Sequence, residues 1–135
     1  MSFVSAKDGT GKQRLFFLGG QVGENEWTGN VKDNYEWNVN SESWIKRQDM
    51  PFTRDHAGSS TVAIGCGFIV AGGSTNEFGK TKDISYYDIP TDTWTMIGEL
   101  PNAINTPVCA YGDGQLFCES GWTQGNFSYR RQIQV

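Results

Sequence analysis

The hydrophobic and polar positions of this chain repeat one plan along its length. An apolar run that ends in two glycines is followed by a polar loop, an alternating strand, a short turn and a strand opened by tryptophan. The plan occupies residues 15–51 and again residues 68–101, and a third copy begins at Leu116. Trp44 and Trp94 hold the same position in the first two copies and lie 50 residues apart. Self-similarity at such a period indicates an array of similar structural units.

The pattern inside each unit predicts strands and no helix, because short alternating runs are bounded by turn-forming residues. We predict strands in the first unit at residues 3–6, 14–19, 30–38 and 43–46, in the second at 57–64, 67–71, 82–88 and 93–97, and in the third at 106–111, 115–118 and 129–135. The units are expected at about residues 1–52, 53–103 and 104–135. Small sheets that must stack on their neighbours to bury both faces are typical of propeller blades.

The repeated residues resemble the kelch repeat over nearly the whole chain. The resemblance rests on paired glycines, an aromatic residue followed by an acidic one, a tryptophan, and an arginine with a histidine after the closing proline: Gly19, Gly20, Trp44, Arg54, His56, Gly72, Gly73, Tyr87, Asp88, Trp94 and Gly121. The copies differ in places, since Ile104 and Thr106 stand in the third where Arg54 and His56 stand in the second. The resemblance implies an all-β fold, a kelch-type β-propeller with blades of four antiparallel strands and a ring that is incomplete within this chain.

The repeated residues have a structural role that needs no ligand. Paired glycines end a strand where a side chain would block close approach of the backbone or where φ is positive. Trp44 and Trp94 are each expected to fill the gap between two blades, with the indole N–H bonded to a carbonyl. The predicted blade core comprises Phe16, Leu18, Phe68, Val70, Leu116 and Phe117.

Composition narrows the classes of partner. The net charge is −4 without a run of lysine or arginine, which argues against nucleic acid and anionic membranes as partners. The sequence has no apolar stretch near the ~20 residues of a membrane helix, and residues 1–15 lack the basic-then-apolar pattern expected of a signal peptide. Three cysteines, Cys66, Cys109 and Cys118, lack CxxC spacing and are predicted to be reduced and buried. The predicted location is cytoplasmic.

The chain offers little for catalysis or metal binding, and we predict no catalytic residue, metal or cofactor. Its single histidine, His56, lies beside Asp55 and near Ser59, but adjacent strand residues point to opposite faces. Arg54 and His56 are instead expected to bond neighbouring backbone. The propeller also resembles that of galactose oxidase, a copper enzyme, and copper sites favour imidazole ligands that one histidine cannot supply in pairs.

Loops are where a binding function is expected. In kelch propellers the loops between the second and third strands and the loops between blades open on one face. The binding residues predicted on this face are aromatic, amide and charged side chains: Trp27, Phe78, Trp122, Phe127, Glu24, Asn76, Glu77, Gln124, Arg54 and Asp55. Tryptophan is enriched in interface hot spots, so a rim of aromatics among polar groups suits a peptide partner. The alternative is that these aromatics fold back and cap their own blades.

Three functions follow from the kelch resemblance. The first is a protein–protein interaction module, such as an adaptor, substrate receptor or scaffold. The second is a segment of a propeller enzyme resembling galactose oxidase, with catalytic residues outside this chain. The third is a structural propeller segment inside a larger assembly. Closed propellers have about four to eight blades, so additional blades, self-association or a partner is needed to close the ring. Of these three ways to close it, we favour additional blades.

Overall fold

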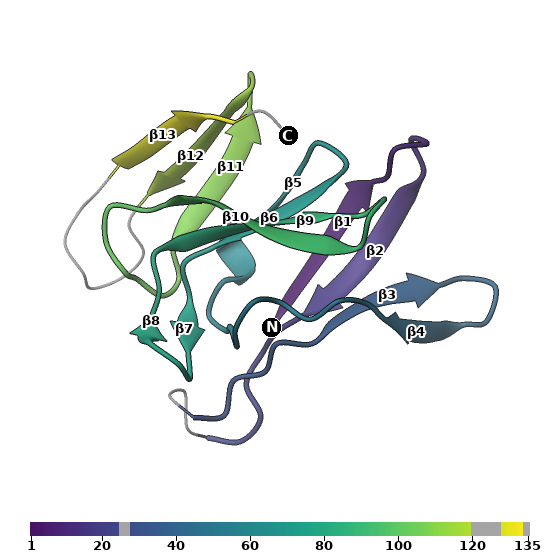
Figure 1. Cartoon of the computed structure of the whole chain (residues 1–135), viewed down its shortest axis with the longest axis horizontal. Helices are drawn as coiled ribbons and strands as arrows, with labels where there is room; N and C mark the ends of the chain where they lie inside the picture. The colour runs from purple at the N-terminus through teal and green to yellow at the C-terminus, as the bar shows by residue number, and fades with distance from the viewer. Residues whose placement is uncertain (25–27, 120–127, 134–135) are drawn as a thin grey trace.

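The structure is a computed structural model that describes residues 1–24, 28–119 and 128–133. These residues form antiparallel sheets, and their single helical element is η1, a 3-10 turn at Gly58–Ser60. Figure 1 shows the sheets arranged side by side without closing into a ring. The all-β propeller fold predicted from the repeat is confirmed. In the part of the chain that the structure describes, no helix is long and apolar enough to cross a membrane.

Each sheet corresponds to one copy of the repeat. Blade 1 has the order β1 (Ser2–Lys7), β2 (Gln13–Leu18), β3 (Asn34–Asn38) and β4 (Ser43–Lys46). Blade 2 consists of β5 (Thr61–Ile64), β6 (Gly67–Ala71), β9 (Asp83–Asp88) and β10 (Thr93–Glu99), paired in that order. Blade 3 consists of β11 (Val108–Gly112), β12 (Gln115–Glu119) and β13 (Ser128–Gln132). A small hairpin of β7 (Ser74–Thr75) and β8 (Gly79–Lys80) interrupts blade 2 between its second and third strands.

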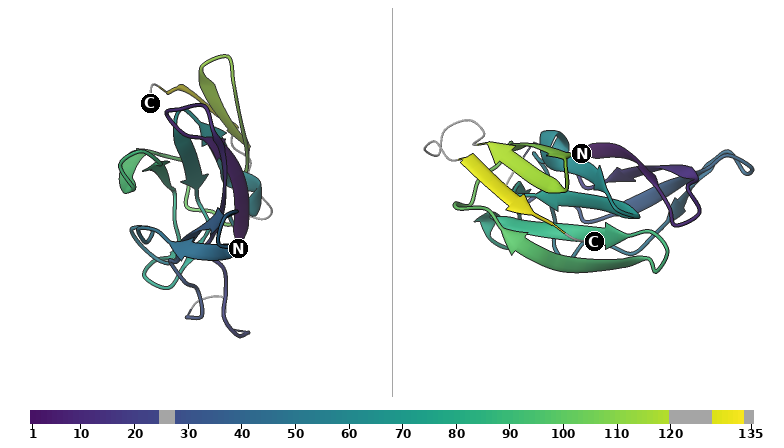
Figure 2. Two further views of the ribbon diagram at one scale, coloured as in Figure 1. Left: turned by 90° about the vertical axis from the view of Figure 1, so that its right-hand side faces the viewer. Right: turned by 90° about the horizontal axis from the view of Figure 1, so that it is seen from above.

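Blade 2 lies between the other two blades, as Figures 1 and 2 show from three directions. The first strands of the three blades, β1, β5 and β11, are neighbours, because β5 contacts both β1 and β11. The blades therefore share one inner edge and fan outward from it, which is the arrangement of propeller blades around an axis.

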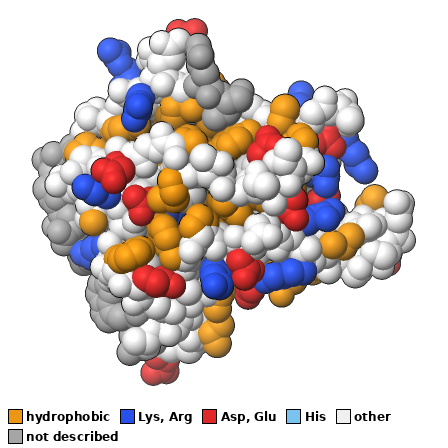
Figure 3. All heavy atoms as spheres, viewed as in Figure 1, with side chains coloured by type: hydrophobic (Ala, Val, Ile, Leu, Met, Phe, Trp, Pro, Cys, Tyr) orange, Lys and Arg blue, Asp and Glu red, His pale blue; other side chains and the backbone are white. Residues whose placement is uncertain are grey.

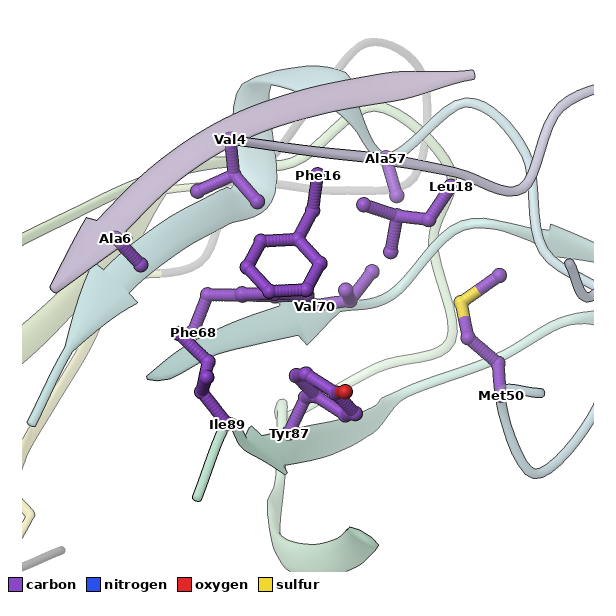
Figure 4. Close-up of a cluster of buried hydrophobic side chains, with 10 residues drawn as sticks. All are labelled: Val4, Ala6, Phe16, Leu18, Met50, Ala57, Phe68, Val70, Tyr87 and Ile89. Atoms are coloured by element: carbon purple, nitrogen blue, oxygen red, sulfur yellow. The ribbon is translucent and has the colours of Figure 1, made fainter. Parts of the chain in front are cut away.

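The junction between blades 1 and 2 is a buried aromatic and aliphatic cluster (Figure 4). Phe16 of β2 contacts Phe68 of β6 and Tyr87 of β9, with ring centroids 5.2 and 5.5 Å apart. Val4 and Leu18 of blade 1 complete the cluster on its other side. The prediction that these phenylalanines belong to the core is confirmed.

Strand β6 is buried on both faces. Phe68 and Val70 point toward blade 1, whereas Ile69 and Ala71 pack in a second cluster with Leu116 and Cys118 of blade 3. One face of β6 therefore packs on blade 1 and the other on blade 3. Because both faces are buried, the sequence of β6 is a continuous apolar run. Phe117 does not belong to the core, because it lies on the outer face of blade 3 and is 41% exposed.

Two of the three cysteines form a disulfide, so the prediction of three reduced cysteines is wrong for Cys109 and Cys118. The two residues lie directly opposite each other on β11 and β12, with Cα atoms 4.2 Å apart. This separation is short for a disulfide but close to its usual range. Cys66, in the turn between β5 and β6, is free and half-buried. The cytoplasmic location stays a prediction.

The first glycine of each pair is required by close approach of the backbone. Gly19 and Gly72 both have positive φ, +63° and +65°. A Cβ at Gly19 would lie 2.4 Å from the main-chain oxygen of Arg54, and one at Gly72 would lie 2.7 Å from that of Ile104. The same backbone contact is thus built twice, one repeat apart.

Candidate binding face

Three segments far apart in the sequence meet at one end of the molecule, and we call their surface the loop face. They are residues 21–24 with 28–31, residues 50–57, and the β7–β8 hairpin. The hairpin and the first segment lie toward the bottom of Figure 1. Asp55 and Ser74 join the last two segments by an isolated bridge with N–H···O bonds of 2.9 and 2.8 Å. The prediction that these loops share a face is therefore met in the part of the chain that is described.

Asn76 fixes the hairpin to blade 1. Its side-chain amide donates to the main-chain oxygen of Asn30 at 2.9 Å and accepts from the Asn30 N–H at 3.1 Å. This two-way bond mimics a pair of backbone hydrogen bonds, so the Asn76 side chain is used in holding two loops together. The backbone N–H of Asn76 also donates to the Thr53 hydroxyl at 2.8 Å.

Glu77 makes a second link between the same loops. Its carboxylate accepts the Thr53 hydroxyl at 2.7 Å and the Thr53 N–H at 3.4 Å. Burial alone would raise the pKa of Glu77, but the hydrogen bonds from Thr53 outweigh it and hold the pKa below its usual value. Glu77 is therefore an anchored anion at the edge of the face.

Phe78 is the exposed aromatic residue that these links position. It is 64% exposed and meets the buried ring of Phe52 edge to face, with centroids 5.4 Å apart. Its backbone N–H donates to the Thr75 hydroxyl at 2.8 Å, which closes the turn of the hairpin. One edge of the ring is thus packed, while most of its surface faces solvent.

Arg54 lies beneath Phe52 and is 2% exposed. Its guanidinium sits over the Phe52 ring at 4.6 Å, and Nη1 donates to the main-chain oxygen of Val70 at 2.8 Å. Nε and Nη2 have no hydrogen-bond partner among the described residues. Burial lowers the pKa of Arg54 to about 10, and the charge of Asp83 opposes this. The expected bond to neighbouring backbone is present, and Arg54 supports the face from below without reaching its surface.

Among the residues that the structure describes, those around His56 do not form a hydrolytic triad. His56 Nδ1 lies 3.5 Å from the Asp55 carboxylate, which also pairs with the N-terminal amine. The Ser59 hydroxyl instead donates to the main-chain oxygen of Pro107 at 2.7 Å. His56 has a positive φ of 55°, and its main-chain oxygen accepts the Thr106 N–H at 2.7 Å. His56 therefore serves the link between the second and third copies through its backbone.

The other predicted binding residues are placed only in part. Glu24 is exposed in the segment 21–31. Trp27, Trp122, Gln124, Phe127 and the repeat glycine Gly121 lie outside the described residues. Sequence reasoning missed Asn30, Phe52 and Thr53, and the available signal was their place in segments that flank the predicted loops. In the described ranges no group of three His, Cys, Asp or Glu side chains is placed to hold a metal ion.

The comparisons with known proteins point to one family. No protein-family model matches the chain. A kelch repeat-containing protein of Arabidopsis thaliana is 27% identical over 84 residues, which are 58% of this chain and 20% of that protein. A solved fungal alcohol oxidase of the AA5 family, in complex with copper, superposes with a TM-score of 0.69 at 17% identity and covers 90% of this chain.

The chain spans only 20% of the length of this curated relative and 27% of that of the oxidase. The oxidase, at this low identity, shows the fold alone. The fifty-residue repeat, the blade topology and these two similarities agree, and together they support a kelch-repeat family and a β-propeller fold for this chain.

Proposed function

We propose that the loop face binds a protein or peptide partner, so that the chain acts as an interaction module. The observation that carries the proposal is the position of Phe78, a large aromatic side chain left mostly in solvent by loops that are themselves tied down. An exposed aromatic held by rigid loops is suited to binding, because little conformational entropy is lost when a partner packs against it.

Polar and charged side chains lie around Phe78, as in an interface with an apolar centre and a polar rim. Glu24, Asn76 and Glu77 are exposed on the same loops. On the side of the molecule seen in Figure 3, acidic and basic side chains are interspersed, and no broad patch of one charge gathers. Interfaces usually combine a hydrophobic centre with a polar edge. The partner expected from this chemistry is a peptide segment with an apolar side chain for Phe78 and hydrogen-bond donors for the carboxylates.

The test is a selection of random displayed peptides on the immobilised chain, followed by calorimetric measurement of affinity. Phe78→Ala should weaken binding roughly tenfold or more, as expected for a hot-spot aromatic, and should leave the melting temperature nearly unchanged. The matched control is Val39→Ser, because Val39 is 67% exposed in the turn between β3 and β4, away from the loop face. If Phe78→Ala lowers stability strongly and leaves binding intact, Phe78 caps its own blade and the proposal fails.

A second candidate is a role as part of a propeller enzyme with its catalytic residues elsewhere. It is favoured by the copper-bound oxidase among structures of this fold. The residues of this chain do not fit such a copper site, since the single histidine, His56, has one carboxylate beside it and its backbone serves a loop contact. Electron paramagnetic resonance of added Cu²⁺ tests this, and tight binding by the chain with alcohol oxidation would favour the enzyme over the interaction module.

A further inference from the structure

The outer face of blade 1, which we call the aromatic face, carries a row of large side chains. The register places Phe3, Phe17 and Tyr35 directly opposite one another on β1, β2 and β3. Trp44 on β4 contacts Phe3 and Phe17, with ring centroids 6.2 and 5.8 Å apart. Phe3 is 59% exposed and Trp44 is 40% exposed. Together these four residues line a cavity of about 330 Å³.

The repeat shows what covers such a face. Counted from the glycine pairs and the repeated tryptophans, Phe17 and Trp44 correspond to Val70 and Trp94 on blade 2. There the face packs against blade 1. The side chains that cover it are Val4, Ala6, Phe16 and Leu18. Trp44 was expected to fill a gap between blades, and no blade of this chain, as far as it is described, covers it. A contiguous exposed aromatic patch of this kind marks an interaction site.

The same molecule presents a second open face that resembles the one covering Trp94. On the outer side of blade 3, Phe117 lies opposite Ala110 on the neighbouring strand. On blade 1, Phe16 lies opposite Val4 in the same way and packs on blade 2. Phe117 and Val108 of this blade 3 face are both exposed large hydrophobic residues. The chain therefore carries two faces that correspond to the two sides of a junction it already makes.

We propose that the aromatic face of blade 1 binds the outer face of blade 3 of a second copy of this chain, head to tail. The contact joins two different surfaces, so it is a heterologous interface that either closes into a ring or continues as a filament. Two copies bring six blades, which lies within the range of about four to eight for closed propellers. A second copy is favoured over an unrelated protein because both halves of the junction are repeats of an interface on this chain. The proposal does not depend on the loop face.

The test is the mass of the 135-residue chain by light scattering on a sizing column, across a wide range of concentration. We expect species at multiples of the 15.0 kDa chain mass. Trp44→Glu removes one half of the junction and Phe117→Glu the other, and both residues are already partly exposed, so the fold should persist. Each variant alone should be a monomer. Mixed together, they should form a one-to-one pair, since each still carries the face that the other has lost.

Each outcome bears on the proposal. A wild-type chain that is folded and monomeric throughout the concentration range overturns it. If Trp44→Glu dissociates the assembly and Phe117→Glu does not, two aromatic faces meet each other, and the proposed partner face is wrong. If the wild type forms filaments or precipitates, both single variants should become monodisperse, and continued aggregation of both overturns the proposal. Val39→Glu is the matched control, and Phe78→Ala should keep self-association even where peptide binding is lost.

Discussion

The indole N–H of Trp94 donates a hydrogen bond of 2.9 Å to the main-chain oxygen of Gln48. The bond ties the last strand of blade 2 to the segment that leaves blade 1. The same ring packs on Phe68 and Tyr87, with centroids 5.7 and 5.1 Å away. Trp94 therefore stabilises the junction between blades 1 and 2 through ring packing and through a hydrogen bond, as expected for a tryptophan that is mostly covered.

We predict that Trp94→Ala destabilises the chain by about 3–5 kcal/mol, the usual cost of deleting a packed tryptophan. Trp44→Ala, at the same position of the preceding repeat, should cost about 1 kcal/mol or less, because its ring is partly exposed on the aromatic face. The measurement is urea unfolding in a Phe117→Glu background, where self-association does not contribute. Equal losses for the two variants would contradict the assigned roles.

The second prediction concerns the glycine pair that ends β6. Gly72→Ala should lower the free energy of unfolding by more than about 2 kcal/mol, because the new methyl group requires an unfavourable φ and meets the Ile104 oxygen. Gly112→Ala is the control, since its added methyl group would have no neighbour within 4 Å and its φ is not positive. Similar melting temperatures for the two variants would show that the backbone around Gly72 adjusts freely.

The third prediction concerns the disulfide of blade 3. Closing the short loop between Cys109 and Cys118, which are nine residues apart, should stabilise the chain by about 2–3 kcal/mol. Reduction, or the paired change to serine, should lower the urea midpoint accordingly. Cys66→Ser should have little effect and serves as the control. If the urea midpoint is the same with and without reductant, the chain carries no disulfide in solution.

The fold was largely readable from the sequence because blade packing imposes a repeat. Phe68 and Trp94 are conspicuous in the pattern, since each must cover a neighbouring blade. The disulfide was missed because three cysteines, an odd number without CxxC spacing, favour reduced thiols over a pairing of Cys109 with Cys118. A signal was nevertheless present, as the two residues are equally distant from the turn at Asp113 and Gly114, and the hairpin register therefore places them opposite each other.

The candidate site was less readable than the fold. The sequence predicts Phe78 as a binding aromatic, with folding back onto its own blade as the alternative, and it lies on the loop face. The sequence does not distinguish a surface residue from an anchoring one in the same loop. Asn76 and Glu77 bond to Asn30 and Thr53, which are distant in the chain and belong to the preceding repeat. Such contacts depend on how two loops meet in space, and short polar segments carry no periodic pattern that fixes this.

The last prediction concerns acid stability, which depends on a charged cluster on blade 1. Arg14 donates to both oxygens of Glu36, at 2.7 and 2.5 Å, and to Asp8 at 3.2 Å, while Arg47 donates to Glu36 at 3.0 Å. Burial raises the pKa of Glu36, but the two arginines outweigh it and hold the pKa below its usual value. The pKa of Asp8 is lowered to about 2, mainly by the hydrogen bond from the Thr10 hydroxyl, with Arg14 contributing.

Both carboxyl groups have lower pKa values in the folded chain than the ordinary value near 4, so their ionised forms stabilise the fold above that pH. This contribution should be lost as the pH falls, and for Asp8 the loss should be complete only below about pH 2. Urea unfolding from neutral to strongly acidic pH should therefore give a steep curve for the wild type and flatter curves for Asp8→Asn and Glu36→Gln. At neutral pH the variants should have a lower free energy of unfolding than the wild type, and the difference should shrink in acid.

Glu99→Gln is the control, since Glu99 pairs with Lys82 on the exposed surface at 3.4 Å, and surface pairs contribute little. Curves that stay parallel at every pH would mean that the cluster does not set the acid stability of the chain.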